Sequence, residues 1–206
     1  MIKLYHAPRT RSMRIIWLLE ELGIPYALET VEFIPPAQGF FAQQTPFGKI
    51  PVIEDGDTVM FESGAIIEYI LERYGDDRLS PPIGSPLRGQ FLQWMHFTEG
   101  TAATPISTFI WHMLYKQDAD KFPEVLEEAR NRAHVGFKLV EESLKGKDYL
   151  LGDEFSAADI MLVFTLTVAG MFGLLDERYP NIAAYMQKME PRPAFQKARA
   201  MALPSS

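Results

Sequence analysis

Apolar positions in the first part of the chain follow a pattern of short strands and helices. Short alternating apolar runs are typical of half-buried strands, whereas apolar positions that recur every three or four residues are typical of helices. Gly23 and Gly75 each follow a helical run and are expected to end it. The pattern predicts strands over residues 2–5, 26–31, 52–54 and 58–61, helices over 12–22 and 65–74, and a short helix over 39–44.

This order is βαβ followed by ββα, which is typical of a small α/β layer of thioredoxin type. Residues 76–86 are rich in proline, serine and glycine, a composition typical of linkers. After them, helical periods predict one or two helices over residues 87–114 and further helices over 123–144, 156–170, 181–189 and 194–201. We therefore expect a thioredoxin-like α/β domain at residues 1–80 and an all-α domain at residues 87–206.

Composition narrows the possible functions. The 206 residues carry a formal net charge of -7, which disfavours nucleic acid as a partner because phosphate binding needs a concentrated basic face. No apolar run approaches the roughly 20 residues that span a bilayer, and Met1 leads directly into a predicted strand without a leader-like segment. We therefore expect a cytoplasmic protein that binds neither nucleic acid nor membrane.

The chain contains no cysteine. Disulfides, thiolate metal sites and catalysis by a thiol of the protein itself are therefore excluded. The four histidines are scattered, and none belongs to a His-x-x-x-His pair with a nearby carboxylate, so we expect no metal site. Any sulfur chemistry must use a thiol that a ligand brings.

Residues 47–64 form the most informative segment. Pro51 stands where a strand should begin, although proline lacks an N–H and cannot extend a sheet ladder from within. A cis Ile50–Pro51 peptide bond would explain this and leave the backbone of Ile50 to pair with a ligand. Glu62 and Ser63 then start a predicted helix, whose N-terminus attracts carboxylates. The segment predicts a site for a small zwitterionic peptide, although a plain strand start and a plain helix cap also explain these residues.

Five motifs together resemble the cytosolic glutathione transferase family, most closely its bacterial and fungal group with a Ser-Arg-like segment at the first helix. They lie at residues 4–8, 11–23, 46–52, 62–66, and 152–153 with 156–159. Each motif alone is weak, but the five are in register and cover nearly the whole chain. The resemblance implies a glutathione-binding thioredoxin-like domain, a helical domain that supplies a pocket for a small hydrophobic electrophile, a homodimer, and a role in detoxification.

The resemblance also implies roles at the glutathione site, with glutathione as the co-substrate. Ile50 and Pro51 would orient the cysteinyl backbone, and Glu62 and Ser63 would hold the γ-glutamyl end. From its position just before Ile50, Lys49 is the candidate that would reach the glycine carboxylate. Gln38 and Gln44 are weaker candidates for the glycine end, because each is most simply explained as a solvated polar residue.

The catalytic group must favour the thiolate of glutathione, since a thiol with a pKa near ~8.5 is mostly protonated at neutral pH. A hydroxyl donor, a helix N-terminus and a nearby cation each favour the anion, and residues 9–12 offer all three. Ser12 is the first candidate donor, because it resembles the family's serine at this helix start, although a plain N-cap also explains it. Thr10 is the alternative donor, Arg11 a nearby cation, and Tyr5 a third, weaker candidate.

Candidate residues for the electrophile pocket lie in an aromatic-rich run of the helical domain. They are Thr104, Ile106, Phe109 and His112. Packing in the core and at a dimer interface explains the aromatic residues of this run equally well. The electrophile therefore cannot be assigned from them.

Ser156 and Asp159 fit a capping box in which Asp replaces the usual Glu. The motif is structural, because it starts a strongly apolar helix in the second domain. We predict that Asp159→Ala destabilises the fold more than it changes substrate affinity.

The first hypothesis for the function is a glutathione transferase that adds the thiolate to an apolar electrophile. A glutathione-dependent peroxidase or disulfide reductase would use the same site, and the reductase would need two glutathione molecules because the chain has no thiol. The second hypothesis is an interaction protein that binds glutathione without turnover. A glutathione-dependent isomerase or dehalogenase is a third.

Overall fold

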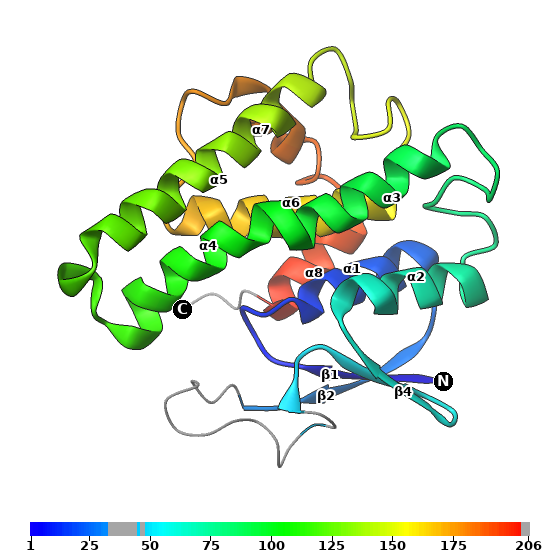
Figure 1. The fold of residues 1–206 in the computed structure, drawn as a ribbon. Coiled ribbons are helices and arrows are strands. Elements are labelled where there is room, and N and C mark those ends of the chain that lie inside the picture. Colours follow the sequence, from blue (N-terminus) through cyan, green and yellow to red (C-terminus); the bar gives the residue numbers. More distant parts are fainter. Residues whose placement is uncertain (33–44, 46–47, 203–206) are drawn as a thin grey trace. The chain divides into compact units, whose positions relative to one another are not determined.

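The structure, a computed structural model, describes residues 1–32, 45 and 48–202, which form two compact units (Figure 1). Unit 1 contains Met1–Ser80 together with the described residues from Met189 onward, and unit 2 contains Pro81–Lys188. Unit 1 thus includes the final helix, which the sequence pattern assigned to the second domain. The predicted short helix at residues 39–44 lies outside the described residues.

A four-stranded mixed sheet forms the centre of unit 1. It contains β1 (Ile2–His6), β2 (Tyr26–Thr30), β3 (Val52–Asp55) and β4 (Thr58–Phe61) in the spatial order β2-β1-β3-β4. β1 pairs parallel with β2, whereas β3 pairs antiparallel with both β1 and β4. The predicted βαβ and ββα order is therefore confirmed, and with it the thioredoxin-like layer.

Three helices, α1 (Ser12–Leu22), α2 (Ser63–Tyr74) and α8 (Pro193–Ala202), cover one face of this sheet (Figure 1). α1 is almost wholly buried because most of its residues are apolar. It ends at Gly23, whose φ of 68° is a left-handed conformation that glycine adopts without a steric penalty.

The grouping of α8 with unit 1 has a local cause. α8 packs along α1, and Arg192 just before it donates to the carboxylate of Glu21 through Nε and Nη2, each at 2.8 Å. These two residues are 171 positions apart in the sequence. Such a pairing leaves no signal in the local apolar pattern, which is why the prediction placed this helix with its sequence neighbours.

Unit 2 is built from helices. They are α3 (Arg88–Phe97), η4 (Thr98–Ala102), α4 (Ala103–Ile110), η5 (Trp111–Lys116), η6 (Ala119–Lys121), α5 (Pro123–Ser143), α6 (Ala157–Met171) and α7 (Pro180–Gln187). The first four follow one another without a break and form the long helix that the apolar pattern predicted (Figure 1). The wider π-helical turn at η4 comes just before Pro105, which lacks an N–H and cannot make the usual bond to the preceding turn.

The predicted capping box at the start of α6 is confirmed. The Asp159 carboxylate is fully buried and accepts four hydrogen bonds. The donors are the N–H of Leu150 (2.9 Å), the N–H and hydroxyl of Ser156 (2.8 and 2.9 Å) and the hydroxyl of Tyr185 (2.8 Å). Burial raises the pKa of Asp159, and the hydrogen bonds that it accepts oppose this rise. The side chain therefore links the start of α6 to α7 and to the loop after α5.

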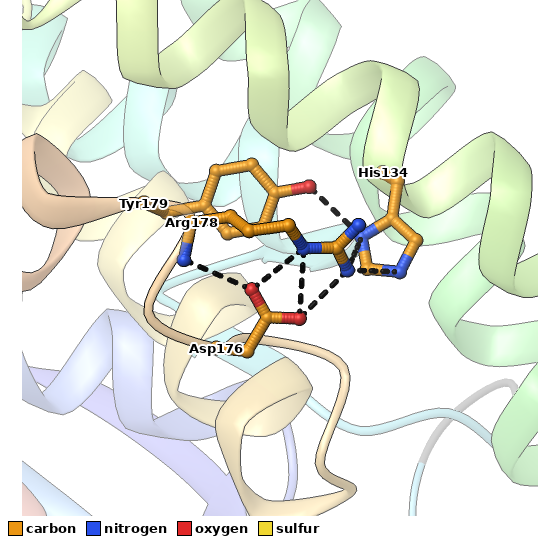
Figure 2. Close-up of polar contacts among 4 residues, drawn as sticks. All are labelled: His134, Asp176, Arg178 and Tyr179. Carbon is orange, nitrogen blue, oxygen red and sulfur yellow. Dashed lines mark hydrogen bonds and ion pairs between the residues drawn. The ribbon is translucent and has the colours of Figure 1, made fainter.

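A second polar cluster joins α5 to the loop before α7 (Figure 2). Arg178 donates to both oxygens of Asp176, and its Nη2 lies 3.0 Å from Nε2 of His134. Because a guanidinium only donates, Nε2 accepts, and the neutral ring then carries its proton on Nδ1, 2.9 Å from the Tyr179 hydroxyl. Burial lowers the pKa of His134, and the nearby Arg178 lowers it further, while Arg178 lowers the pKa of Asp176 to about 2.

Two properties of the described residues bear on the possible function classes. No helix among them is long and apolar enough to cross a membrane. Nor do these residues contain a group of three or more histidine and acidic side chains that is arranged to hold a metal ion.

Candidate functional site

Three chain segments meet at one edge of unit 1. In the sheet register Tyr5 lies opposite Val52, and Val52 lies opposite Phe61. The end of β1, the start of β3 and the end of β4 are therefore neighbours. The chain after β1 leads into α1 and the chain after β4 leads into α2, so both helices begin near this edge. The predicted glutathione site and the predicted catalytic loop thus lie together.

The Ile50–Pro51 peptide bond is cis, as the sequence predicted. The ladder between β1 and β3 ends at the Tyr5–Val52 pair, so Ile50 lies just beyond the last paired residue. Its side chain is half-buried and packs on a small apolar cluster at the end of β1 and the start of β3. This packing holds the backbone of Ile50 at the end of the sheet.

The residues predicted for the glycine end are described only in part. Lys49 is exposed, and its carbonyl accepts a hydrogen bond of 3.0 Å from the hydroxyl of Thr45. This bond fixes the backbone beside Ile50. Gln38 and Gln44 lie outside the described residues.

Glu62 and Ser63 form the start of α2, as predicted. Glu62 is exposed and has φ 72° and ψ 106°, a conformation that a side-chain-bearing residue rarely adopts and that costs about 1–3 kcal/mol. The first helical bond runs from the N–H of Ile66 to the carbonyl of Glu62 (2.9 Å). The N–H groups of Ser63, Gly64 and Ala65 precede this bond, so they belong to the turn that has no intrahelical acceptors. The start of α2 is therefore a suitable site for an anion.

Arg14 is the residue at this edge that the sequence analysis missed. It lies on α1 with a fully buried side chain, and its Nη1 donates to the Ser63 hydroxyl at 2.9 Å. Ser63 is itself only 3% exposed. A signal was present in the sequence, because Arg14 is the single charged residue among the mostly apolar positions 12–19. Buried charges need polar partners, so a partner elsewhere in the chain was to be expected.

The hydroxyl of Ser12 is enclosed by the protein. Its Oγ lies 2.7 Å from His6 Nδ1 and 2.7 Å from Thr10 Oγ1, and the residue is 0% exposed. The His6 ring also hydrogen-bonds the backbone of Met201 in α8, and burial lowers the pKa of His6, so the ring is neutral. With its proton on Nε2 toward the Met201 carbonyl, the ring accepts at Nδ1 from the Ser12 hydroxyl. The Ser12 proton is then already used within unit 1.

Thr10 is the more exposed of these two residues. It is half-buried, and its Oγ1 donates to the Ala7 carbonyl at 2.7 Å. The preceding residue, Arg9, is exposed, has φ 64°, and donates its N–H to the Ala202 carbonyl of α8 at 2.7 Å. Arg11 is half-buried at the N-cap of α1. The loop therefore places one half-buried threonine and two arginines at the start of a helix.

Tyr5, the third candidate donor, is engaged elsewhere. Its hydroxyl donates to Glu54 Oε1 at 2.6 Å and accepts from Lys3 Nζ at 3.1 Å. Both partners lie on neighbouring residues of β1 and β3, and only a small part of Tyr5 is exposed. The tyrosine hydroxyl is thus part of a polar chain across the sheet.

The four candidate pocket residues do not share one face of their helix. Ile106 and Phe109 are buried in unit 2, whereas Thr104 is exposed and bonds back to the Gly100 carbonyl at 3.1 Å. Two helical steps separate Thr104 from Ile106, which is a rotation of roughly 200°. His112 is half-buried, and its Nδ1 lies 2.8 Å from Asp118. Helix geometry therefore separates residues that the sequence pattern grouped.

Two family models match the chain. The model for the glutathione S-transferase N-terminal domain matches residues 1–72, and the model for the glutathione S-transferase C-terminal domain matches residues 103–193. The first range contains the whole edge described above. The second covers most of unit 2.

Individual relatives agree with these models over nearly the full length. Glutathione S-transferase F10 of Arabidopsis thaliana is 31% identical over 97% of each chain. A glutathione S-transferase structure from Actinobacillus pleuropneumoniae is 30% identical, with a TM-score of 0.79 over 98% of this chain and 93% of its own. The glutathione transferase URE2P6 from Phanerochaete chrysosporium, solved with oxidized glutathione, is 26% identical, with a TM-score of 0.82 over 96% and 94% of the two chains.

Proposed function

We propose that this chain, which belongs to the glutathione S-transferase family, binds glutathione at the edge of unit 1 and transfers its thiolate to a small hydrophobic electrophile. The observation that carries this proposal is the meeting of Ile50–Pro51, the start of α2 and the start of α1 at one edge of a single unit. These parts supply backbone, anion-binding and thiol-activating groups within reach of one small peptide.

Each part of glutathione has a matching group at this edge. The γ-glutamyl carboxylate meets the Ser63 hydroxyl and the first amides of α2, and Glu62 accepts from the γ-glutamyl ammonium. The backbone of Ile50 pairs with the cysteinyl unit at the end of the sheet, as an added strand would. Lys49, an exposed residue next to Ile50, approaches the glycine carboxylate.

Thr10 is the proposed hydrogen-bond donor to the thiolate of glutathione. Thr10 is half-buried, and its hydroxyl can turn from the Ala7 carbonyl toward a sulfur, whereas the Ser12 proton is held by buried His6. The N-terminus of α1 and the charges of Arg9 and Arg11 add to the stabilisation of the anion. Ser12 Oγ lies 2.7 Å from Thr10 Oγ1 and so limits the positions open to the Thr10 side chain.

The absence of cysteine from the chain determines how the second candidate function, reduction of peroxides or disulfides, would proceed. With no thiol in the chain, reduction of a disulfide or peroxide would consume two glutathione molecules and release glutathione disulfide. The related URE2P6 structure was solved with oxidized glutathione, which supports the idea that this fold accommodates the product. A peroxidase or disulfide reductase activity is therefore the alternative at the same site.

We further propose a cytoplasmic homodimer. On unit 2, Val135 is 74% exposed and Leu139 48% exposed, and both line a hollow of about 360 Å³ between α5 and the η4 segment. Exposed apolar side chains around a hollow are typical of an interface. Light scattering after size exclusion tests this: Val135→Glu should yield monomers, and an unchanged mass would contradict the assignment of this face.

Turnover of an aryl halide by the wild type, Thr10→Val and Ser12→Ala tests the main proposal. We expect Thr10→Val to lose most activity while it still binds glutathione, and Ser12→Ala to lose less. Unchanged turnover in both variants would refute the catalytic assignment. If the wild type binds glutathione but turns over neither electrophiles, peroxides nor disulfides, the chain is a binding protein instead.

A further inference from the structure

We propose that Arg14 is a positioning residue that sets the direction of the Ser63 hydroxyl, so that the start of α2 selects a ligand carboxylate. This inference rests on the proposed function, because the carboxylate in question is that of the γ-glutamyl unit. It adds a residue of α1, buried and out of contact with solvent, to the recognition of that group.

The direction follows from the chemistry of the two side chains. A guanidinium has five donors and no acceptor, so in the 2.9 Å contact Arg14 donates and Ser63 Oγ accepts. The serine hydroxyl then keeps its single proton for another partner. The first N–H groups of α2 are donors as well. Arg14 therefore makes the start of α2 present donors only, which suits a carboxylate and disfavours groups that must donate.

Burial strengthens this effect and fixes the geometry. Arg14 is 0% exposed and lies on a helix whose neighbouring residues are also fully buried, so its guanidinium has little freedom to turn. A positive charge next to Ser63 in a poorly solvated interior attracts an anion more strongly than the same charge on the surface. The lysine side chain shares the charge and the donor-only character, whereas glutamine is neutral and both donates and accepts.

The test compares glutathione with 4-aminobutyryl-cysteinyl-glycine, which lacks only the γ-glutamyl α-carboxylate. Calorimetry gives the Kd of each ligand for the wild type, Ser63→Ala, Arg14→Gln and Arg14→Lys, and thermal melting reports the fold of each variant. We expect the wild type to prefer glutathione by at least about tenfold, since hydrogen bonds to charged groups are strong. Ser63→Ala and Arg14→Gln should lose most of that preference, and Arg14→Lys should retain it.

A merely structural role for Arg14 predicts a different result. Arg14→Gln would then bind both ligands more weakly by the same factor, and the ratio of their Kd values would be unchanged. That result would overturn the inference while leaving the proposed function intact. Equal binding of the two ligands by the wild type would overturn it too. A wild type that binds no glutathione would overturn the proposed function and this inference with it.

A second readout keeps the inference testable if Arg14→Gln does not fold. The side-chain N–H resonances of Arg14 in the wild type are identified by their loss in Arg14→Lys. They should shift when glutathione is added and shift much less with the analogue. Equal shifts with both ligands would contradict a link between Arg14 and the carboxylate.

Discussion

Asp159→Ala should unfold this protein far more readily than it changes ligand binding. The carboxylate accepts four hydrogen bonds at 2.8–2.9 Å from Leu150, Ser156 and Tyr185, and these residues are all buried. Alanine removes every one of these acceptors. Water cannot replace them readily, because the side chain and its partners lie inside unit 2.

The magnitude follows from the groups left without a partner. A buried donor without an acceptor costs about 1–3 kcal/mol. The hydroxyls of Ser156 and Tyr185 can rotate toward other acceptors, so we count only the two backbone N–H groups in full. The expected loss is about 4 kcal/mol, a large share of the 5–15 kcal/mol that typically stabilises a domain.

Urea denaturation of the wild type and three variants measures this loss. Asp153→Ala is the matched control, because Asp153 is an exposed acid close by and its loss should change stability by less than about 0.5 kcal/mol. Asp159→Asn keeps the volume but turns one acceptor into a donor, so it should also destabilise strongly. The Kd for glutathione should stay near the wild-type value wherever the variants are folded.

Equal stability of Asp159→Ala and Asp153→Ala would contradict this prediction. Wild-type stability of Asp159→Asn would contradict it too, because the volume of the side chain rather than its hydrogen-bond acceptors would then matter.

Three further predictions concern the thiol, the histidines and a helix end. Thr10→Val should raise the pKa of the thiol of bound glutathione, which the ultraviolet absorbance of the thiolate measures, and kcat/KM at neutral pH should fall about tenfold for each unit of that rise. Ser12→Ala should raise this pKa less. A larger rise in Ser12→Ala than in Thr10→Val would contradict the donor assignment. The pKa of His134 is lower in the folded protein than its unfolded value near 6.5, so the unfolded chain takes up the proton first and stability present above about pH 6.5 is lost as the pH falls. The urea midpoint of the wild type should therefore drop between about pH 7.5 and 5.5, and that of His134→Gln should drop less. Equal drops in the two proteins would show that His134 is not the source of this pH dependence. Gly23→Ala forces a left-handed φ on alanine and should lower the free energy of unfolding by about 1 kcal/mol. Gly89→Ala, at an open helical position, should leave the stability unchanged or raise it. Urea denaturation curves of the two variants measure this contrast, and equal stabilities would contradict it.

Local signals predicted much of unit 1. The helix end at Gly23, the cis bond at Pro51 and the start of α2 at Glu62–Ser63 are each encoded within a few residues. Glycine and proline restrict or permit particular backbone angles whatever surrounds them, so their effects are visible in the sequence. The same holds for the Ser156–Asp159 capping box, where both partners lie one helical turn apart.

Long-range pairings could not be predicted in this way. The apolar run at residues 12–19 predicted a buried helix but not that Arg14 would meet Ser63, 49 positions away. Ser12 is the first candidate donor by its resemblance to the family's serine at this helix start, yet the structure encloses its hydroxyl between His6 and Thr10. Such contacts depend on how strands and helices pack, and the type of a residue alone does not predict which distant residue it contacts.

The sequence by itself determined the order of elements, the lack of a protein thiol and the segment suited to a small peptide. The tertiary structure decided that Ser12 is fully buried whereas Thr10 is half-buried, that Arg14 contacts Ser63 at the start of α2, and that the last helix groups with the first. The physical reason is the range of the forces involved. Backbone preferences and helix caps act between neighbours in the chain, whereas burial and buried hydrogen bonds act between neighbours in space.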